Sequence, residues 1–152
     1  MSNTLRLSMV AMLGAGALFT GGVVWYAWER VWLWQRLPLA SYAIDFRRSV
    51  RKADPLLPIL LLITGTAAGI FASVTGGFPR TLAIIAIIQL GFVLVGSLLL
   101  AEPINSHFRR RREGDVPPEA ANLRDRWRRF HLLRTGFVIA AFFLLVTAVT
   151  YV

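Results

Sequence analysis

Residues 81–101, TLAIIAIIQLGFVLVGSLLLA, decide the fold class of this chain. The stretch contains no charged side chain, and Gln89 is its only amide. Crossing the hydrocarbon core of a bilayer takes a helix of about 20 mainly apolar residues. Apolar residues lie on every face of this stretch, whereas a helix of a soluble bundle keeps one polar face. The stretch therefore predicts a transmembrane helix.

Three further stretches meet the same requirement, at about residues 7–28, 56–76 and 132–152. Only the last contains a charge, Arg134 near its start. Overall 56% of residues are hydrophobic and 16% are charged, against about 45–50% and about 25% in soluble domains. We therefore predict an all-α integral membrane four-helix bundle that forms a single transmembrane domain over residues 1–152.

The 17 Lys and Arg residues exceed the 8 Asp and Glu residues, and their positions predict the topology. All but Arg6 and Arg80 lie in residues 29–54 and 102–134. Because cytoplasmic loops carry the excess of Lys and Arg, we expect the connections 29–54 and 102–131 to be cytoplasmic. Both termini then lie outside the cytoplasm, in a bacterial-type inner membrane. No groove-reading or base-stacking motif accompanies the cations, which argues against nucleic-acid binding.

Neither connection has the composition of a simple linker. Leu37-Pro38 ends the first helix, and residues 39–53 are amphipathic, which predicts an interfacial helix. We place Arg47 on its polar side. The Trp residues near position 28 fit an interfacial aromatic belt or a surface on which a ligand stacks. An exposed turn over residues 109–118 joins the third and fourth spans into an extended hairpin.

Polar residues on the two helices of this hairpin fall on matching faces. Glu102, Asn105 and Arg109 have i, i+3, i+7 spacing, and the incoming helix repeats that pattern. The faces can meet at one membrane depth, either as an ion-pair cluster that ties the hairpin together or as a functional site. Asp45 lies on the correct side to join them. The residues of the incoming helix are Arg124, Trp127, His131 and Arg134.

Metals and cofactors are poorly supported by this sequence. Cysteine is absent, and Glu102 and His107 are five residues apart, which separates them around a helix. We therefore expect no metal and no cofactor. The expected partners are membrane lipid, a hydrophobic small molecule, and a membrane protein or a second copy of the chain. The GxxxG motif at Gly65 and Gly69 favours helix packing inside the bundle first and homodimerisation second.

Three segments together resemble the small four-helix membrane proteins of the anthrone-oxygenase-like family, many of which are known only as a domain of unknown function. The most specific elements are Pro103 and Asn105, followed by the W-x3-H-x2-R pattern of Trp127, His131 and Arg134. The segments are YAIDFRRSVRKADPLLP at 42–58, EPINSHF at 102–108 and LRDRWRRFHLLRT at 123–135.

The resemblance implies oxidation of an anthrone to an anthraquinone by O₂ without a cofactor. On that hypothesis His131 is the base, Asn105 and Arg134 stabilise the oxyanion, and Asp45 or Glu102 orients the imidazole. The substrate-contacting candidates are Trp127, Tyr42 and Gln89. The alternative is a non-catalytic membrane subunit whose polar cluster and basic face bind lipid or a partner protein.

Overall fold

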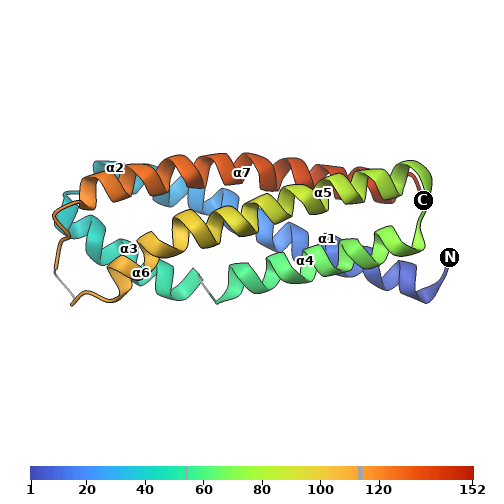
Figure 1. Ribbon diagram of the computed structural model, residues 1–152, viewed down its shortest axis with the longest axis horizontal. Helices are drawn as coiled ribbons and strands as arrows, with labels where there is room; N and C mark the ends of the chain where they lie inside the picture. The colour runs from blue at the N-terminus through green and yellow to red at the C-terminus, as the bar shows by residue number, and fades with distance from the viewer. Residues whose placement is uncertain (54, 113–114) are drawn as a thin grey trace.

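The computed structural model describes residues 1–53, 55–112 and 115–152, and this part of the chain is all-α, without strands. Five continuous helices follow one another, and two of them contain short π-helical segments (Figure 1). Their parts are α1 (Asn3–Trp25), η1 (Tyr26–Val31) and α2 (Trp32–Arg36), then α3 (Leu39–Ala53), α4 (Leu56–Val74), α5 (Gly77–Gly96), η2 (Ser97–Ala101) and α6 (Glu102–Arg109), and finally α7 (Ala120–Thr150).

Four of these helices are long and apolar enough to cross a membrane, so the chain is a multi-pass membrane protein. They cover Asn3–Arg36, Leu56–Val74, Gly77–Arg109 and Ala120–Thr150. The predicted spans lie within them, apart from a few residues at their ends. The third of these four helices starts at Gly77 rather than near 81, because the chain turns at Thr75 and Gly76. Gly77 has a φ of 58°, a conformation that costs glycine least.

The four long helices run side by side, and both termini lie at one end of the bundle (Figure 1). Helix α1 packs mainly on α4, and α5 packs on α7. The opposite end carries α2, α3 and α6. This arrangement agrees with the even number of spans predicted from the sequence.

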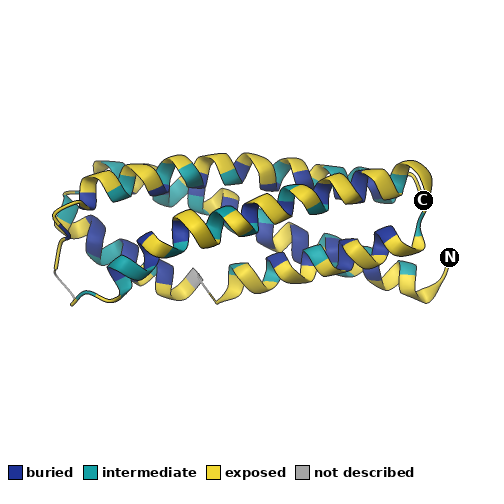
Figure 2. Cartoon of the chain, viewed as in Figure 1, coloured by how far each residue is buried: buried dark blue, intermediate teal, exposed yellow. Residues whose placement is uncertain are grey.

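The outer surface of the bundle is apolar over much of its length. Exposed residues line the outside of every long helix, while buried residues face inward (Figure 2). Val10, Leu18, Phe92 and Phe143 each leave more than 60% of their surface open. Small residues such as Ala68, with 0% exposure, allow the helices to approach closely inside. Such a surface suits lipid chains and not water.

Among the described residues, the two glycines of the GxxxG motif make no close helix contact, contrary to our expectation. A Cβ atom built on Gly65 or Gly69 meets no atom within 4 Å. The close approach uses Gly16 instead, where an added Cβ would lie 3.2 Å from Phe142 and 3.3 Å from Thr64. The packed face of α4 is therefore the one that carries Thr64.

The amphipathic helix α3 has the predicted bounds, and its apolar face closes one end of the bundle. Phe46 has 0% exposure, and its ring centroid lies 5.0 Å from that of Trp34 and 5.3 Å from that of Trp127. Arg47, predicted on the polar side, is instead only 4% exposed and donates from Nε to the carbonyl oxygen of Phe108 at 2.9 Å. A guanidinium there complements the C-terminal carbonyls of α6. Of the predicted turn, Glu113 and Gly114 lie outside the described residues.

Candidate functional site

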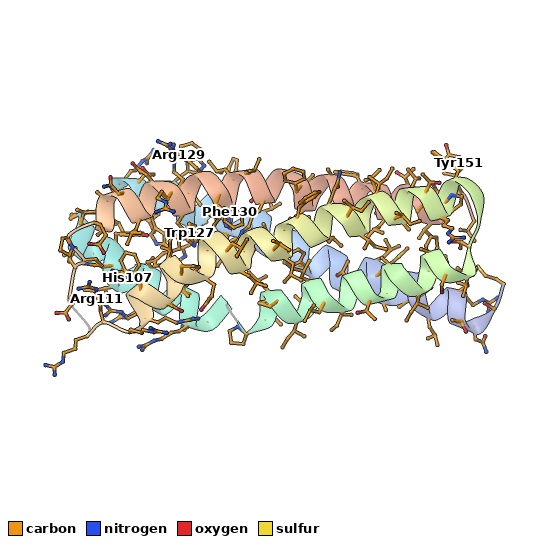
Figure 3. All side chains as sticks on the ribbon, viewed as in Figure 1. His107, Arg111, Trp127, Arg129, Phe130 and Tyr151 are labelled. Atoms are coloured by element: carbon orange, nitrogen blue, oxygen red, sulfur yellow. The ribbon has the colours of Figure 1, made fainter. Side chains whose placement is uncertain are left out.

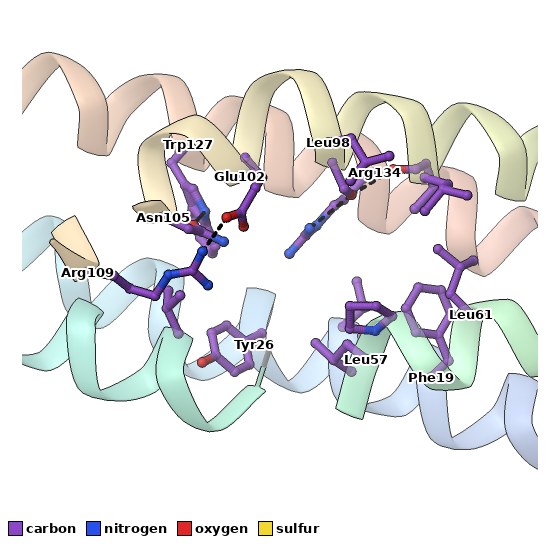
Figure 4. Close-up of a pocket in the computed structure, with 17 residues that line it drawn as sticks. Phe19, Tyr26, Leu57, Leu61, Leu98, Glu102, Asn105, Arg109, Trp127 and Arg134 are labelled. Atoms are coloured by element: carbon purple, nitrogen blue, oxygen red, sulfur yellow. Dashed lines mark hydrogen bonds and ion pairs between the residues drawn. The ribbon is translucent and has the colours of Figure 1, made fainter. Parts of the chain in front are cut away.

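A cavity of about 280 Å³ lies between the helices, below the end of the bundle that α3 closes (Figure 4). It has an apolar part and a polar part. The apolar lining residues are Phe19, Val23, Val50, Leu57, Pro58, Leu61, Val93, Leu94, Leu98 and Ala101. The polar and amphipathic ones are Tyr26, Ser97, Glu102, Asn105, Arg109, Trp127 and Arg134. The cavity thus suits a ligand with a polar group at one end of an apolar body.

Both π-helical segments contribute to this cavity. Tyr26 opens η1, and Ser97 opens η2, which leads directly into Glu102. A π-helical turn inserts one extra residue and changes the direction of the side chains that follow it; such turns are frequent at functional sites. The two segments therefore set which side chains of α1 and of the α5–α6 helix face the cavity.

Glu102 is the carboxylate of the cavity. Its Oε1 atom pairs with Arg109 and accepts a hydrogen bond from Ser106 Oγ at 2.6 Å. The i, i+7 spacing brings Glu102 and Arg109 together within one helix, so this pair does not tie the two helices of the hairpin together as the expected ion-pair cluster would. The Glu102 side chain is still 41% exposed. One oxygen is thus engaged while the side chain remains partly exposed, and Glu102 lines both the cavity and the outer face of α6.

Asn105 and Trp127 join α6 to α7 in the wall of the cavity. The Nε1 atom of Trp127 donates to Oδ1 of Asn105 at 3.1 Å, and both residues are buried. The ring of Trp127 stacks on that of His131, with centroids 4.7 Å apart and an interplanar angle of 9°. The W-x3-H part of the sequence pattern is therefore one packed unit, with Trp127 toward the cavity and His131 behind it.

Arg134 places its guanidinium in the cavity, as Figure 4 shows. Its Nη1 atom donates to Ser97 Oγ at 3.3 Å, and its Nε and Nη2 atoms lie 3.1 and 2.8 Å from Nδ1 of His131. A guanidinium can only donate hydrogen bonds, so Nδ1 is the acceptor and a neutral His131 carries its proton on Nε2. With Arg109 and Glu102, the cavity lining has a net positive charge.

His131 itself is fully buried and does not line the cavity. The backbone of Val23 lies beside its ring, and Nε2 has no hydrogen bond of normal geometry to any described residue. In this arrangement the free electron pair of the imidazole points at Arg134 rather than at a ligand. His131 thus holds Arg134 in place.

Asp45, Tyr42 and Gln89 lie away from the cavity. Oδ2 of Asp45 accepts hydrogen bonds from Trp34 Nε1 at 2.6 Å and from Arg30 at 3.1 Å, which ties α3 to the end of the first helix. Gln89 lies in the middle of α5, with a buried Oε1 atom that lacks a hydrogen-bond partner among the described residues. Tyr42, on α3, packs against the rings of Trp34 and Phe108.

The hydroxyl of Tyr42 is buried without a hydrogen-bond partner among the described residues, and this burial raises its pKa above the usual range. We expect Tyr42→Phe to raise the free energy of unfolding by about 1 kcal/mol, because an unsatisfied polar group is removed. Denaturant titration of the purified protein in detergent measures this change, which should not vary with pH near neutrality. Tyr151→Phe, at an exposed position, should change nothing. A loss of stability in Tyr42→Phe would contradict this description of the hydroxyl.

Of the polar and amphipathic lining residues, Tyr26 and Ser97 were not predicted from the sequence. Arg109 was predicted only as part of the polar face that it shares with Glu102. Nothing in the sequence pattern singled out Tyr26 or Ser97. Their positions depend on the π-helical segments, which the hydropathy pattern does not reveal.

Among the described residues, no group of three or more His, Asp or Glu side chains is placed to hold a metal ion. His107 pairs through Nε2 with Glu119 at 2.9 Å and lies apart from His131. What the cavity offers a ligand is therefore hydrogen bonds and charge from Glu102, Arg109 and Arg134, next to an aromatic and aliphatic wall.

The fold defines a small multi-pass membrane protein whose helices enclose a largely apolar cavity with a polar end. The family model for anthrone oxygenase matches residues 46–144 of this chain. The chain therefore belongs to the anthrone oxygenase family. The matched range contains Glu102, Asn105, Trp127 and Arg134 of the cavity. Searches of the curated proteins and of the solved structures found no match.

Proposed function

We propose that the protein oxidises an anthrone-like aromatic substrate to the quinone with O₂, inside the membrane and without a cofactor. The observation that carries the proposal is the cavity, which combines an apolar chamber with a carboxylate and two guanidinium groups. Family membership supports the same chemistry. The reaction consumes one anthrone and one O₂ and yields one anthraquinone and one water.

The lining suggests how the substrate lies. A flat hydrocarbon body fits among Phe19, Leu61 and Leu94, while its keto oxygen reaches Arg134 at the polar end. Apolar substrates partition into the bilayer, and the cavity is lined by Pro58, which is exposed on the outer surface. We propose that the substrate enters sideways from the lipid past Pro58.

The first chemical step is removal of a proton from the methylene carbon opposite the keto group. We assign this proton to Glu102, because its carboxylate faces the cavity while the Nδ1 electron pair of His131 is engaged by Arg134. The electron pair of the broken C–H bond moves into the rings, and the keto oxygen becomes an oxyanion. Arg134 stabilises that charge at low dielectric, where such a contact is strong.

The carbanion then forms a C–O bond with O₂, which is reduced to a peroxide and takes the proton from Glu102. Loss of the second C–H proton to Glu102 forms the new C=O bond as the O–O bond breaks. The departing hydroxide accepts this proton and leaves as water. Asn105 holds the Trp127 ring against the substrate, and His131 keeps the Arg134 guanidinium directed into the cavity.

Turnover in a reconstituted system tests the proposal. The full chain in lipid nanodiscs is given anthrone and O₂, and quinone absorbance is recorded together with O₂ uptake. We expect one O₂ consumed per quinone, at a rate well above that of protein-free nanodiscs. Arg129→Gln serves as a control, because Arg129 is exposed and points away from the bundle (Figure 3). A rate equal to that of protein-free nanodiscs would defeat the proposal.

We also propose that the end of the bundle bearing α2, α3 and α6 faces the cytoplasm, because the cations concentrate there. A reporter fused after Val152 should then lie outside the cytoplasm. Alkaline phosphatase, which needs export, is expected to be active, and a cytoplasmic fluorescent reporter to stay dark. The opposite pair of results would reverse the orientation.

A further inference from the structure

A second concavity, which shares Leu98 and Glu102 with the cavity, runs along the outer face of η2 and α6. This groove has a volume of about 600 Å³. Its lining residues are Leu98, Glu102, Pro103, Ser106, His107, Arg110 and Arg111. We refer to it as the α6 groove. Figure 3 places His107 and Arg111 at the end of the bundle where the cations concentrate.

The charges of the α6 groove are only partly balanced. Glu102 pairs with Arg109, and His107 pairs with Glu119 at 2.9 Å. Within the described part of the chain, no carboxylate pairs with Arg110 or Arg111; Arg111 lies 3.3 Å from Nε2 of His107. The groove therefore presents two adjacent guanidinium groups to an anion.

The apolar part of the groove lies farther along the span than Arg110, away from the charged end of the bundle. Leu98 and Leu99, which are 59% and 69% exposed, belong to the lipid-facing surface of the span. At 1.5 Å per residue, Leu98 and Arg110 are separated by about 18 Å along the helix. An occupant must therefore contact aliphatic side chains at one end and guanidinium groups at the other.

We propose that the α6 groove binds one anionic phospholipid, with its phosphate on Arg110 and Arg111 and an acyl chain along Leu98 and Pro103. Guanidinium groups bind phosphate oxygens in pairs, and anionic lipids are concentrated at the leaflet that attracts basic segments. A free phosphate would use the cations but leave the apolar wall in contact with lipid tails. This inference does not depend on the proposed oxidation.

Retention of lipid by the purified full chain tests the inference. The protein is reconstituted with equal phosphatidylcholine and phosphatidylglycerol, washed with detergent at high salt, and analysed by native mass spectrometry. High salt removes diffuse attraction, so about one phosphatidylglycerol should stay bound to each unmodified chain. In Arg110→Gln/Arg111→Gln the amount of bound phosphatidylglycerol should fall at least tenfold. The control is Arg126→Gln/Arg129→Gln, two exposed arginines on α7, which should retain the lipid.

The outcomes separate the possible sources of binding. Equal losses in the two double variants would show diffuse attraction to the basic end and overturn the proposal. Release of the lipid by inorganic phosphate or glycerol phosphate would show a site for the phosphate alone, and equal retention of phosphatidylcholine would show no charge recognition; either result overturns it. Circular dichroism of each variant checks that the helices remain folded, and Arg110→Lys/Arg111→Lys, which keeps the charge, should restore part of the retention.

Discussion

Arg134→Gln is expected to lower kcat/KM for quinone formation by about 10²–10³, the usual effect of removing one oxyanion donor. The glutamine side chain is shorter and neutral, so it cannot place a positive charge where the oxyanion develops. Initial rates in nanodiscs at several anthrone concentrations measure the change. Arg129→Gln on the same helix should keep full activity. If Arg134→Gln keeps it too, Arg134 does not stabilise the transition state.

The same assay separates two roles for His131. A residue that only positions Arg134 through Nδ1 can be replaced by Asn, whose Oδ1 atom also accepts a hydrogen bond. We therefore expect His131→Asn to lose much less activity than Arg134→Gln, and His131→Leu to lose nearly as much. If His131 is instead the base, as the family resemblance implied, Asn and Leu should be equally inactive.

Glu102→Gln is expected to lower kcat by about 10²–10⁴, the range for loss of a general base. Glutamine has nearly the same shape and can still accept from Arg109 and Ser106, but it cannot take a proton. A substrate deuterated at the methylene carbon should react more slowly, because that C–H bond breaks in the first step. The rate of quinone formation with both substrates measures the two effects.

Glu119→Gln is the matched control for this carboxylate. Glu119 lies at the start of α7, pairs with His107 and does not line the cavity. It should leave kcat unchanged. Full activity in Glu102→Gln would show that Glu102 does not transfer the proton. The proposed oxidation would then need another base.

Local signals in the sequence were enough to predict the helices. Continuous apolar stretches predicted four spans, and Leu37-Pro38 predicted where the first helix ends, since proline disfavours a helical residue before it. The bounds of α3 followed from its amphipathic pattern. The Glu102 and Arg109 pair followed from helical spacing, because both residues lie on one helix and need no tertiary information.

Other predictions failed where the environment of a side chain depends on a distant segment. Arg47 has the sequence context of a solvated arginine, yet the C-terminal end of α6 covers it. Gly65 and Gly69 form a recognised packing motif, yet a Cβ atom added at either position meets no atom of the described residues within 4 Å. Both outcomes depend on where distant segments of the chain lie, and periodicity carries no information about that.

The class of protein, the number of spans and the family could be predicted from the sequence, because these depend on apolar length, charge distribution and local motifs. Which polar residues share a cavity depends on the packing of the helices in three dimensions. The π-helical segments turn Tyr26 and Ser97 inward, and the packing of α7 on α5 and η2 places Trp127 and Arg134 at the lining with His131 behind them. Contacts between helices set the direction of these side chains, and the residue pattern of a single helix carries no information about such contacts.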